Sequence, residues 1–230
     1  MKLSGLQKLT LLDFPNKTAA TVFTPGCDFR CPFCHNRELV SGPYPTYPPE
    51  DFFAFLETRH GLLDGVCITG GEPLMQADIG SFCQRIHDMG FAVKLDTNGS
   101  YPDALRDLVS AGLLDYVAMD VKNSPDSYAR TVGIPDFNVA NVNRSIEFLL
   151  KKQVPCEFRT TVVAELHDEM SLVRTARWIQ DAPAWYLQEF TDSQTVMAGS
   201  GALHAFPRKK MEDLLPELRE ILPNTHIRGF

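Results

Sequence analysis

The chain has 230 residues, 44% of them hydrophobic, and a formal net charge of −7 with an isoelectric point near 5.4. This length and composition suit one sizeable core, and no linker or low-complexity run divides the sequence, so we expect a single domain over residues 1–230. Because the charge is acidic and no basic cluster occurs, the sequence predicts neither a nucleic-acid surface nor an anionic-membrane surface. No apolar run approaches the roughly 18 residues of a membrane-spanning helix.

Short β-rich apolar runs alternate with helical patterns in chain order. Strands are predicted over residues 17–24, 65–69, 91–95, 115–121, 156–163 and 185–190. Amphipathic helices are predicted over 79–89, from Pro102 onward, around 146–150 and around 172–179. The apolar spacing at 211–218 predicts a helical cover over about 205–230, with Pro216 kinking or dividing it. The core of the fold is then about residues 17–192.

The repeated strand–helix alternation predicts parallel strands joined by right-handed crossovers. Two α/β architectures fit six such units, namely an open, partial (β/α)6 barrel of the TIM type and a doubly wound sheet. Polar or glycine-rich clusters follow the carboxyl ends of nearly every predicted strand, which is typical of a barrel site, whereas a doubly wound sheet concentrates such residues at one switch point. We therefore predict the partial barrel.

The first of these clusters places three cysteines on one short loop, Cys27, Cys31 and Cys34, with the spacing C-x3-C-x2-C. Three thiolates can hold three irons of a four-iron, four-sulfur cluster and leave the fourth iron open, whereas a closed structural site takes four protein ligands. Two alternatives stay open here: a haem-attachment pattern at 31–35, and a zinc site that recruits His35. Haem attachment of this type accompanies export, and residues 1–20 predict no signal peptide.

The other three cysteines, Cys67, Cys83 and Cys156, lie far apart in the sequence among apolar neighbours. We expect them to be small buried hydrophobic residues, so a second metal cluster is not predicted. Clustered thiols in a chain without a leader point to a reducing cytosol, and we expect a cytoplasmic protein.

Three further clusters could bind a small ligand. The glycine pair at 70–71 lets a ligand approach the backbone, and Glu72 could hold an ammonium group, although a plain turn has the same pattern. The run 96–99, Asp-Thr-Asn-Gly, is equally compatible with an Asx-turn. Asp120 and Lys122 can face one side of an apolar strand, where a buried internal ion pair is the alternative. Together these groups suit a zwitterionic amino acid that carries a positive sulfur and a nucleoside.

The cysteine spacing with Phe33 before the last cysteine, followed by Gly-Gly-Glu-Pro and then Asp-Thr-Asn-Gly, resembles the radical S-adenosylmethionine superfamily, and within it the activases of glycyl radical enzymes. The segments 6–15, 34–38, 157–161 and 187–190 are most similar to the activating proteins of anaerobic ribonucleoside-triphosphate reductase. The resemblance covers residues 5 to about 192. The cysteine motif combined with Gly-Gly-Glu-Pro is highly specific for the superfamily.

The resemblance implies one [4Fe-4S] cluster on Cys27, Cys31 and Cys34, whose open iron chelates S-adenosylmethionine. It further implies that one electron from a flavodoxin or ferredoxin-like donor cleaves the sulfonium. The resulting 5'-deoxyadenosyl radical would then abstract a hydrogen from a glycine of a partner enzyme. The partner that the resemblance implies is anaerobic ribonucleotide reductase. The implied cofactor contacts are Phe33, His35, Gly70, Gly71, Glu72, Asp96, Asn98, Lys122, Arg159 and Gln188. The residues that match a site for a monovalent cation, Na+ or K+, are Asp96, Thr97 and Asp120.

The sequence departs from related activases at two points. The ribose-proximal histidine of pyruvate formate-lyase activases has no counterpart in 187–190, where we expect Gln188 as the substitute. The inserted ferredoxin region of some activases is absent.

Two other functions remain as hypotheses. One is a radical enzyme with a small-molecule substrate, similar to the carboxydeazaguanine-forming branch, and the other is a non-catalytic zinc-binding or electron-carrying protein.

Overall fold

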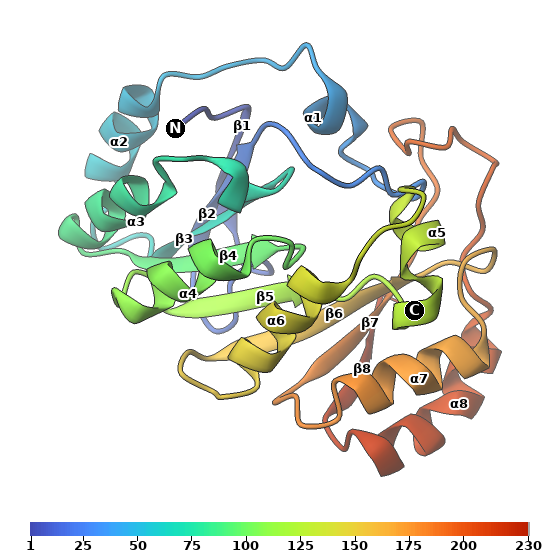
Figure 1. Cartoon of the computed structure of the whole chain (residues 1–230). Coiled ribbons are helices and arrows are strands. Elements are labelled where there is room, and N and C mark those ends of the chain that lie inside the picture. The colour runs from blue at the N-terminus through green and yellow to red at the C-terminus, as the bar shows by residue number, and fades with distance from the viewer. Residues whose placement is uncertain (230) are drawn as a thin grey trace.

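The computed structural model describes residues 1–229 and contains one eight-stranded sheet whose strands follow one another in chain order (Figure 1). The strands are β1 (Gly5–Thr10), β2 (Ala19–Thr24), β3 (Gly65–Gly70), β4 (Ala92–Thr97), β5 (Tyr116–Asp120), β6 (Cys156–Val162), β7 (Trp185–Glu189) and β8 (Thr225–Arg228). Strands β2 to β8 pair in parallel, and β1 pairs antiparallel with β2. This sequential order is that of a β/α barrel, since the strand order of a doubly wound sheet reverses.

Helices form most of the connections. They are α1 (Arg37–Ser41), α2 (Pro49–Glu57), α3 (Ile79–Asp88), α4 (Pro102–Ser110), α5 (Tyr128–Val132), α6 (Ala140–Leu149), α7 (Glu169–Trp178) and α8 (Arg208–Ile221), with the 3-10 turns η1 (Pro73–Met75) and η2 (Pro125–Ser127). Proline opens α2 and α4, where its missing N–H removes no helical hydrogen bond. Within the described part of the chain, no helix is long and apolar enough to cross a membrane.

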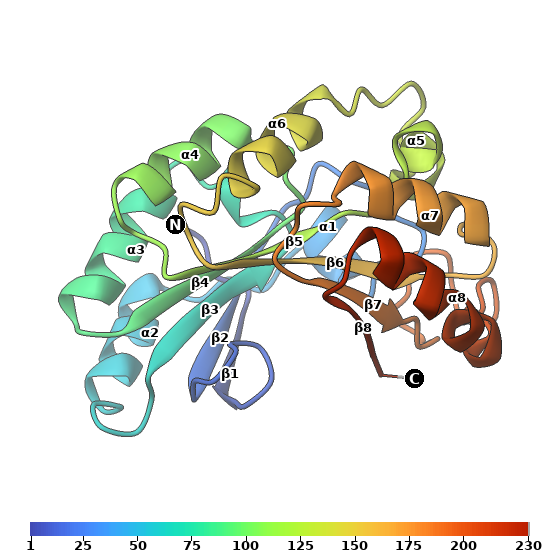
Figure 2. The same cartoon turned by 90° about the horizontal axis from the view of Figure 1, so that it is seen from below.

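The sheet is curved without closing on itself. Strands β1 and β8 each pair with a single neighbouring strand, so they are the two edges of the sheet within residues 1–229. Figure 2 shows α3, α4, α6 and α7 over the convex side of the sheet, with the two edge strands apart on the opposite side. The predicted partial barrel is therefore confirmed, and its concave side is open.

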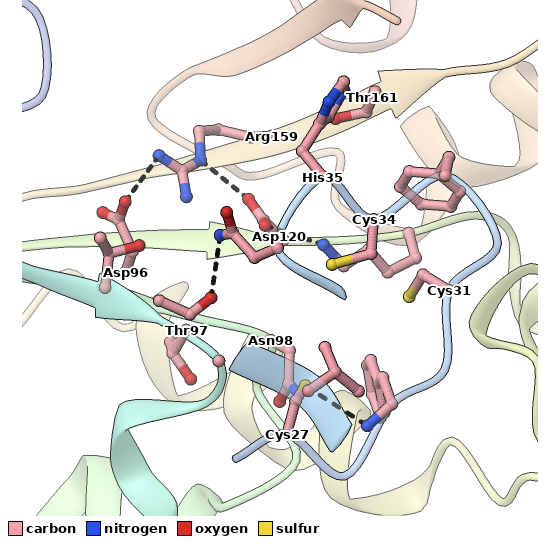
Figure 3. Close-up of a pocket in the computed structure, with 18 residues that line it drawn as sticks. Cys27, Cys31, Cys34, His35, Asp96, Thr97, Asn98, Asp120, Arg159 and Thr161 are labelled. Carbon is pink, nitrogen blue, oxygen red and sulfur yellow. Dashed lines mark hydrogen bonds and ion pairs between the residues drawn. The ribbon is translucent and has the colours of Figure 1, made fainter. Parts of the chain in front are cut away.

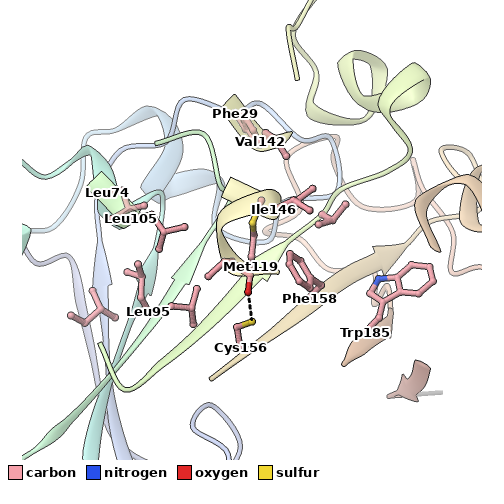
Figure 4. Close-up of a cluster of buried hydrophobic side chains, with 14 of the residues drawn as sticks. Phe29, Leu74, Leu95, Leu105, Met119, Val142, Ile146, Cys156, Phe158 and Trp185 are labelled. Carbon is pink, nitrogen blue, oxygen red and sulfur yellow. Dashed lines mark hydrogen bonds between the residues drawn. The ribbon is translucent and has the colours of Figure 1, made fainter. Parts of the chain in front are cut away.

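Alternate residues of the strands give the sheet an apolar convex face. Ile68 lies beside Leu95 in register, and further along the sheet Met119 lies beside Phe158, which lies beside Trp185. All five side chains are fully buried, and the apolar stripes of α4 and α6 pack onto this face (Figure 4). Burying a large apolar side chain contributes roughly 1.5–3 kcal/mol, so this face supplies much of the stability that holds the helices on the sheet.

The intervening residues of the same strands form a polar concave face. One row across the sheet runs through Asp120, Arg159 and Tyr186, which are neighbours in register. Nearby, the Tyr116 hydroxyl donates to the Glu157 carboxylate at 3.1 Å, and Glu157 is only 2% exposed. A closed β/α barrel fills this space with branched apolar side chains. Here the charged interior instead forms the wall of an open cleft.

The six predicted strands agree with β2 to β7 within two residues at each end. Strand β1 was not predicted, and it lies before the predicted core of residues 17–192. The predicted helical cover over 205–230 consists of α8 followed by strand β8, which extends the sheet beyond β7. Helix α8 continues through Pro216 without interruption. The expectation of a wholly helical C-terminal segment is therefore corrected.

Candidate active site

The three motif cysteines lie on the loop that follows β2 at the carboxyl edge of the sheet. Cys31 is buried, and Cys27 and Cys34 are half-buried. The loop is shaped by short-range hydrogen bonds: the Phe29 N–H lies 3.4 Å from Cys27 Sγ, and the Cys34 N–H donates to the Cys31 carbonyl at 3.0 Å. All three cysteines line the same cavity (Figure 3).

The glycine pair at the end of β3 lets a second loop approach the cysteine loop closely. Gly70 has φ of +116°, and a Cβ on Gly71 would lie 1.8 Å from the Gly26 carbonyl oxygen. The same oxygen accepts a hydrogen bond from the Glu72 N–H at 2.8 Å. Asn36 donates its side-chain amide to the Gly70 carbonyl at 3.2 Å. Both glycines are therefore needed for the loops to meet, whatever ligand they also contact.

These loops and the ends of β4, β5 and β6 surround a cavity of about 200 Å³ (Figure 3). All the predicted site residues line it except Glu72 and Gln188; they are Cys27, Cys31, Phe33, Cys34, His35, Gly70, Gly71, Asp96, Thr97, Asn98, Asp120, Lys122 and Arg159. The lining also includes Phe29, Asn36, Val40, Thr69 and Thr161, which the site prediction does not contain. These five residues carry no charge, and only the folded chain shows that they reach the cavity.

Glu72 lies beneath the loop that follows β4 and is fully buried. Its carboxylate accepts hydrogen bonds from the Thr97 hydroxyl at 2.8 Å, the Asn98 N–H at 2.7 Å and the Leu74 N–H at 3.0 Å. Burial raises the pKa of Glu72 to about 7, although these donors act in the opposite direction. In this arrangement Glu72 holds the β4 loop in place and does not itself line the cavity. Its contact with a ligand amine stays a prediction.

Gln188 lies on β7, paired in register with Thr161 of β6. Thr161 lines the cavity, whereas Gln188 is one strand further from the cysteine loop and does not. The proposed contact between Gln188 and the ribose likewise stays a prediction.

Four charged side chains that line the cavity alternate in sign, namely Asp96, Arg159, Asp120 and Lys122. The buried Lys94, which does not line the cavity, pairs with Asp96 at the end of this row. Figure 3 shows Arg159 between the two aspartates. Arg159 donates from Nε to Asp120 at 2.8 Å and from Nη1 to Asp96 at 3.2 Å. Burial would raise the pKa of both aspartates, but the opposite charges hold both below their usual range. The internal ion pair considered from the sequence is present. Lys94 is the member that the sequence prediction missed, although a charge within an apolar strand was a usable signal.

The Asp-Thr-Asn-Gly run forms the Asx-turn that its sequence also suggests. The Asn98 side-chain oxygen accepts a hydrogen bond from the Ser100 N–H at 2.9 Å. The Asn98 amide nitrogen donates to Asp28 at 2.8 Å and lies 3.9 Å from Cys27 Sγ. One residue thus closes the turn after β4 and ties it to the cysteine loop.

The segment 191–207, which we call the C-terminal strap, forms backbone hydrogen bonds with the cysteine loop. The Met197 N–H donates to the Cys34 carbonyl at 3.0 Å, and the Ala198 N–H donates to the Pro32 carbonyl at 2.8 Å. Val196, which directly precedes these two residues, is fully buried. The sequence assigned no role to this segment, because backbone hydrogen bonds leave no signature in residue types.

The chemistry of the donor set fits an iron–sulfur cluster. Burial raises the pKa of the Cys27 and Cys31 thiols to about 12, so ligation as thiolates must release their protons. Within residues 1–229, no three Cys, His, Asp or Glu side chains gather closely enough to hold a single metal ion. A cluster of several irons instead takes each thiolate on a separate iron. Three sulfur donors beside a glycine backbone and Lys122 leave room for a further, non-protein ligand.

Residues 21–178 match the family model of the radical SAM superfamily. The chain belongs to this superfamily. It is therefore a radical SAM enzyme, and membership implies a [4Fe-4S] cluster and S-adenosylmethionine as cofactors. The haem and zinc interpretations of the cysteine loop lose their support, since the family match covers the cysteines, the glycine pair and the polar ends of β4 to β6 together.

The chain is similar in sequence to two relatives and in fold to one solved structure. A protein of Methanocaldococcus jannaschii named as a glycyl-radical enzyme activating enzyme is 31% identical over 191 residues, which cover 81% of this chain and 79% of the relative. The 7-carboxy-7-deazaguanine synthase of Thermoplasma acidophilum is 28% identical over 162 residues, which cover 70% and 74%. The crystal structure of Streptococcus suis SuiB bound to S-adenosylmethionine has a TM-score of 0.70 at 12% identity, over 91% of this chain and 52% of that chain. The last likeness concerns the fold alone.

Proposed function

We propose that this radical SAM enzyme activates a glycyl radical enzyme, and that its partner is anaerobic ribonucleoside-triphosphate reductase. The observation that carries the proposal is the convergence of the cysteine loop, the glycine pair and Lys122 on one cavity at the open side of an incomplete barrel. The relative from M. jannaschii supports an activase. The resemblance of segments 6–15 and 157–161 supports the reductase as partner.

Each part of the cavity has a task in this proposal. Cys27, Cys31 and Cys34 would hold the cluster, which, when bound and reduced, would supply the electron that splits S-adenosylmethionine into methionine and a 5'-deoxyadenosyl radical. Lys122 faces the methionine carboxylate, and the backbone at 70–71 contacts the amine. The backbone at 33–35 contacts the adenine. Transfer of a hydrogen atom from the partner's glycine to this radical would then give 5'-deoxyadenosine and a glycyl radical.

The open concave side fits a partner that completes the site. A primary-carbon radical has to be kept from water and side reactions. Within residues 1–229 the edge strands β1 and β8 do not meet, so the chain alone does not close the barrel. We expect a loop of the partner that bears the target glycine to enter over the cluster and supply this closure. A flavodoxin or ferredoxin-like protein would deliver the electron.

Formation of 5'-deoxyadenosine with and without the partner tests this proposal. We expect slow, uncoupled cleavage of S-adenosylmethionine by the reconstituted protein alone, and a clear increase when anaerobic ribonucleotide reductase is added. A reductase variant whose target glycine is changed to alanine is the matched control, because it can still dock, but a methyl group replaces one of the two Cα hydrogens and no glycyl radical can form. An unchanged rate with the intact reductase would argue against this partner.

A second candidate is a radical enzyme with a small-molecule substrate. The observation that favours it is the 28% identity to a 7-carboxy-7-deazaguanine synthase over 70% of this chain. Rapid turnover of a purine-like or other small substrate by the chain alone, with no response to the reductase, would support this function in place of the first.

A further inference from the structure

The three residues that match a monovalent-cation site are already engaged with other groups of the chain. Each of the four carboxylate oxygens of Asp96 and Asp120 receives a cationic donor. Asp96 Oδ1 is paired with Lys94, and its Oδ2 accepts from Arg159 at 3.2 Å. Asp120 Oδ1 accepts from Arg159 Nε at 2.8 Å, and its Oδ2 accepts from Lys122 at 2.8 Å. Arg159 is thus the group that lies between the two carboxylates.

Thr97, the third residue of the expected cation site, is also engaged in hydrogen bonds within the chain. Its hydroxyl donates to Glu72 Oε1 at 2.8 Å and accepts a hydrogen bond from the Gly99 N–H at 3.1 Å. Thr97 is 3% exposed. Its hydroxyl therefore serves the turn after β4, and recruiting it to a cation would disturb the contact with the buried Glu72.

The charge balance of the wall opposes an additional cation. Lys94, Arg159 and Lys122 carry three positive charges against the two negative charges of Asp96 and Asp120. The side chains of Asp96 and Arg159 are each only 14% exposed, so water screens these charges weakly. The surplus positive charge complements one carboxylate of a ligand. Once that carboxylate is bound, an alkali ion would add an uncompensated positive charge to a poorly solvated site.

We propose that the Arg159 guanidinium takes the place of the monovalent cation, so that this chain binds the methionine carboxylate of S-adenosylmethionine without Na+ or K+. Arg159 acts as a positioning residue, because it holds Asp96 of β4 and Asp120 of β5 together, and Asp120 in turn holds Lys122 toward the cavity. The guanidinium is suited to this position, since its planar fork can donate to two carboxylates at once. This inference rests on membership of the superfamily, and it does not depend on which partner is activated.

Binding of S-adenosylmethionine to the reconstituted wild-type protein, measured by equilibrium dialysis in choline, sodium or potassium chloride at equal ionic strength, tests the inference directly. We expect the dissociation constants in the three salts to agree within twofold. Tightening of tenfold or more by Na+ or K+, with saturation in the millimolar range, would overturn it. The assay contains no partner enzyme, so a failure here and a failure to form a glycyl radical are separate results.

Variants at position 159 provide the complementary arm. Arg159→Gln leaves the two aspartates without their shared cation, and we expect at least tenfold weaker binding in choline that K+ or Na+ restores in part. The melting temperature of the cluster-free variant should likewise rise with K+, while that of the wild type should not. Arg159→Lys keeps the positive charge, so a lower concentration of Na+ or K+ should restore its binding of S-adenosylmethionine. Arg106→Gln, on the exposed face of α4, should behave as wild type. A variant at 159 that folds but shows no cation dependence would contradict the proposal.

Discussion

At the scale of single residues, burial does not separate the three proposed cluster ligands from the other cysteines. Cys31 and Cys83 are both buried, and both thiols have a pKa raised to about 12 by burial. What distinguishes Cys31 is its loop, which also presents Cys27 and Cys34 to the cavity. Position on the chain was therefore a better guide to metal ligation than the environment of any single thiol.

We expect replacement of Cys27, Cys31 or Cys34 by alanine to abolish a cluster of about four irons per chain, because each thiolate holds one iron. Iron and sulfide analysis after anaerobic reconstitution measures this loss. Cys83→Ala in α3 is the matched control and should keep the full iron content. Equal loss of iron from the control, or stoichiometric zinc in protein purified without oxygen, would contradict the assignment.

Glu72 gives a prediction for stability as a function of pH. Its pKa is raised from 4.5 in the unfolded chain to about 7 in the fold, so between these values the folded state holds a proton that the unfolded state has lost. The contribution of Glu72 to stability is therefore greatest below about pH 4.5, falls as pH rises to about 7, and is then constant. The shift corresponds to roughly 3 kcal/mol. In urea unfolding at a series of pH values, Glu72→Gln should flatten this decline, and an unchanged slope would show that Glu72 is ionised throughout.

Lys122 should matter for the cofactor and not for the cluster. Lys122→Met loses a charge-assisted contact worth about 1.5–3 kcal/mol, so we expect S-adenosylmethionine to bind roughly 10- to 150-fold more weakly with iron content unchanged. Equilibrium dialysis and iron analysis on the same sample measure both quantities. Lys151→Met, at an exposed position after α6, serves as the control. Cluster loss in the Lys122 variant would point to a structural role instead.

At the scale of elements, the C-terminal strap is bonded to the cysteine loop. Its backbone N–H groups at Met197 and Ala198 bond to the carbonyls of Cys34 and Pro32, and the buried Val196 anchors it. The same segment leads into α8 and β8, which form one edge of the open barrel. The strap therefore connects the edge strand β8 with the cysteine loop.

We predict that Val196→Asp loosens the strap and speeds the loss of iron from the reconstituted protein to a chelator under anaerobic conditions, by about tenfold. Burying a carboxylate without a partner is strongly unfavourable, so the strap should detach before the barrel unfolds. Gln194→Asp, two residues away and exposed, places the same charge on the strap without burial and should release iron at the wild-type rate. Equal release rates in the two variants would contradict a supporting role for the strap.

The sequence predicted those elements whose apolar residues follow a pattern that matches their burial in the fold. Strands β2 to β7 carry apolar residues for the convex face, and their boundaries follow from that pattern. Strand β8 was missed because it has four residues and its exposed His226 and Arg228 lack an apolar pattern, so pairing with β7 is what defines it. The direction of the Glu72 side chain could not be predicted from the sequence either. A carboxylate after a strand can point into a cavity or below it, and here the turn at Pro73 and Leu74 directs it below.

At the scale of the whole molecule, one curved sheet separates two kinds of interior. The convex face and its helices form an apolar core, and the concave face collects charged side chains beside the cysteine loop. Because β1 and β8 remain apart within residues 1–229, the reacting groups face an opening that a second protein can enter. In the proposed function this chain therefore performs the chemistry, and its partner closes the site.

Electron paramagnetic resonance of a frozen anaerobic mixture tests the central claim most directly. The mixture contains the reconstituted protein, a reductant, S-adenosylmethionine and anaerobic ribonucleotide reductase, with single omissions and the Cys31→Ala variant as controls. We expect a glycyl radical doublet that appears only when all components are present and that Cys31→Ala abolishes. A complete mixture without the doublet, in which the protein still turns over a small substrate rapidly by itself, would contradict the account.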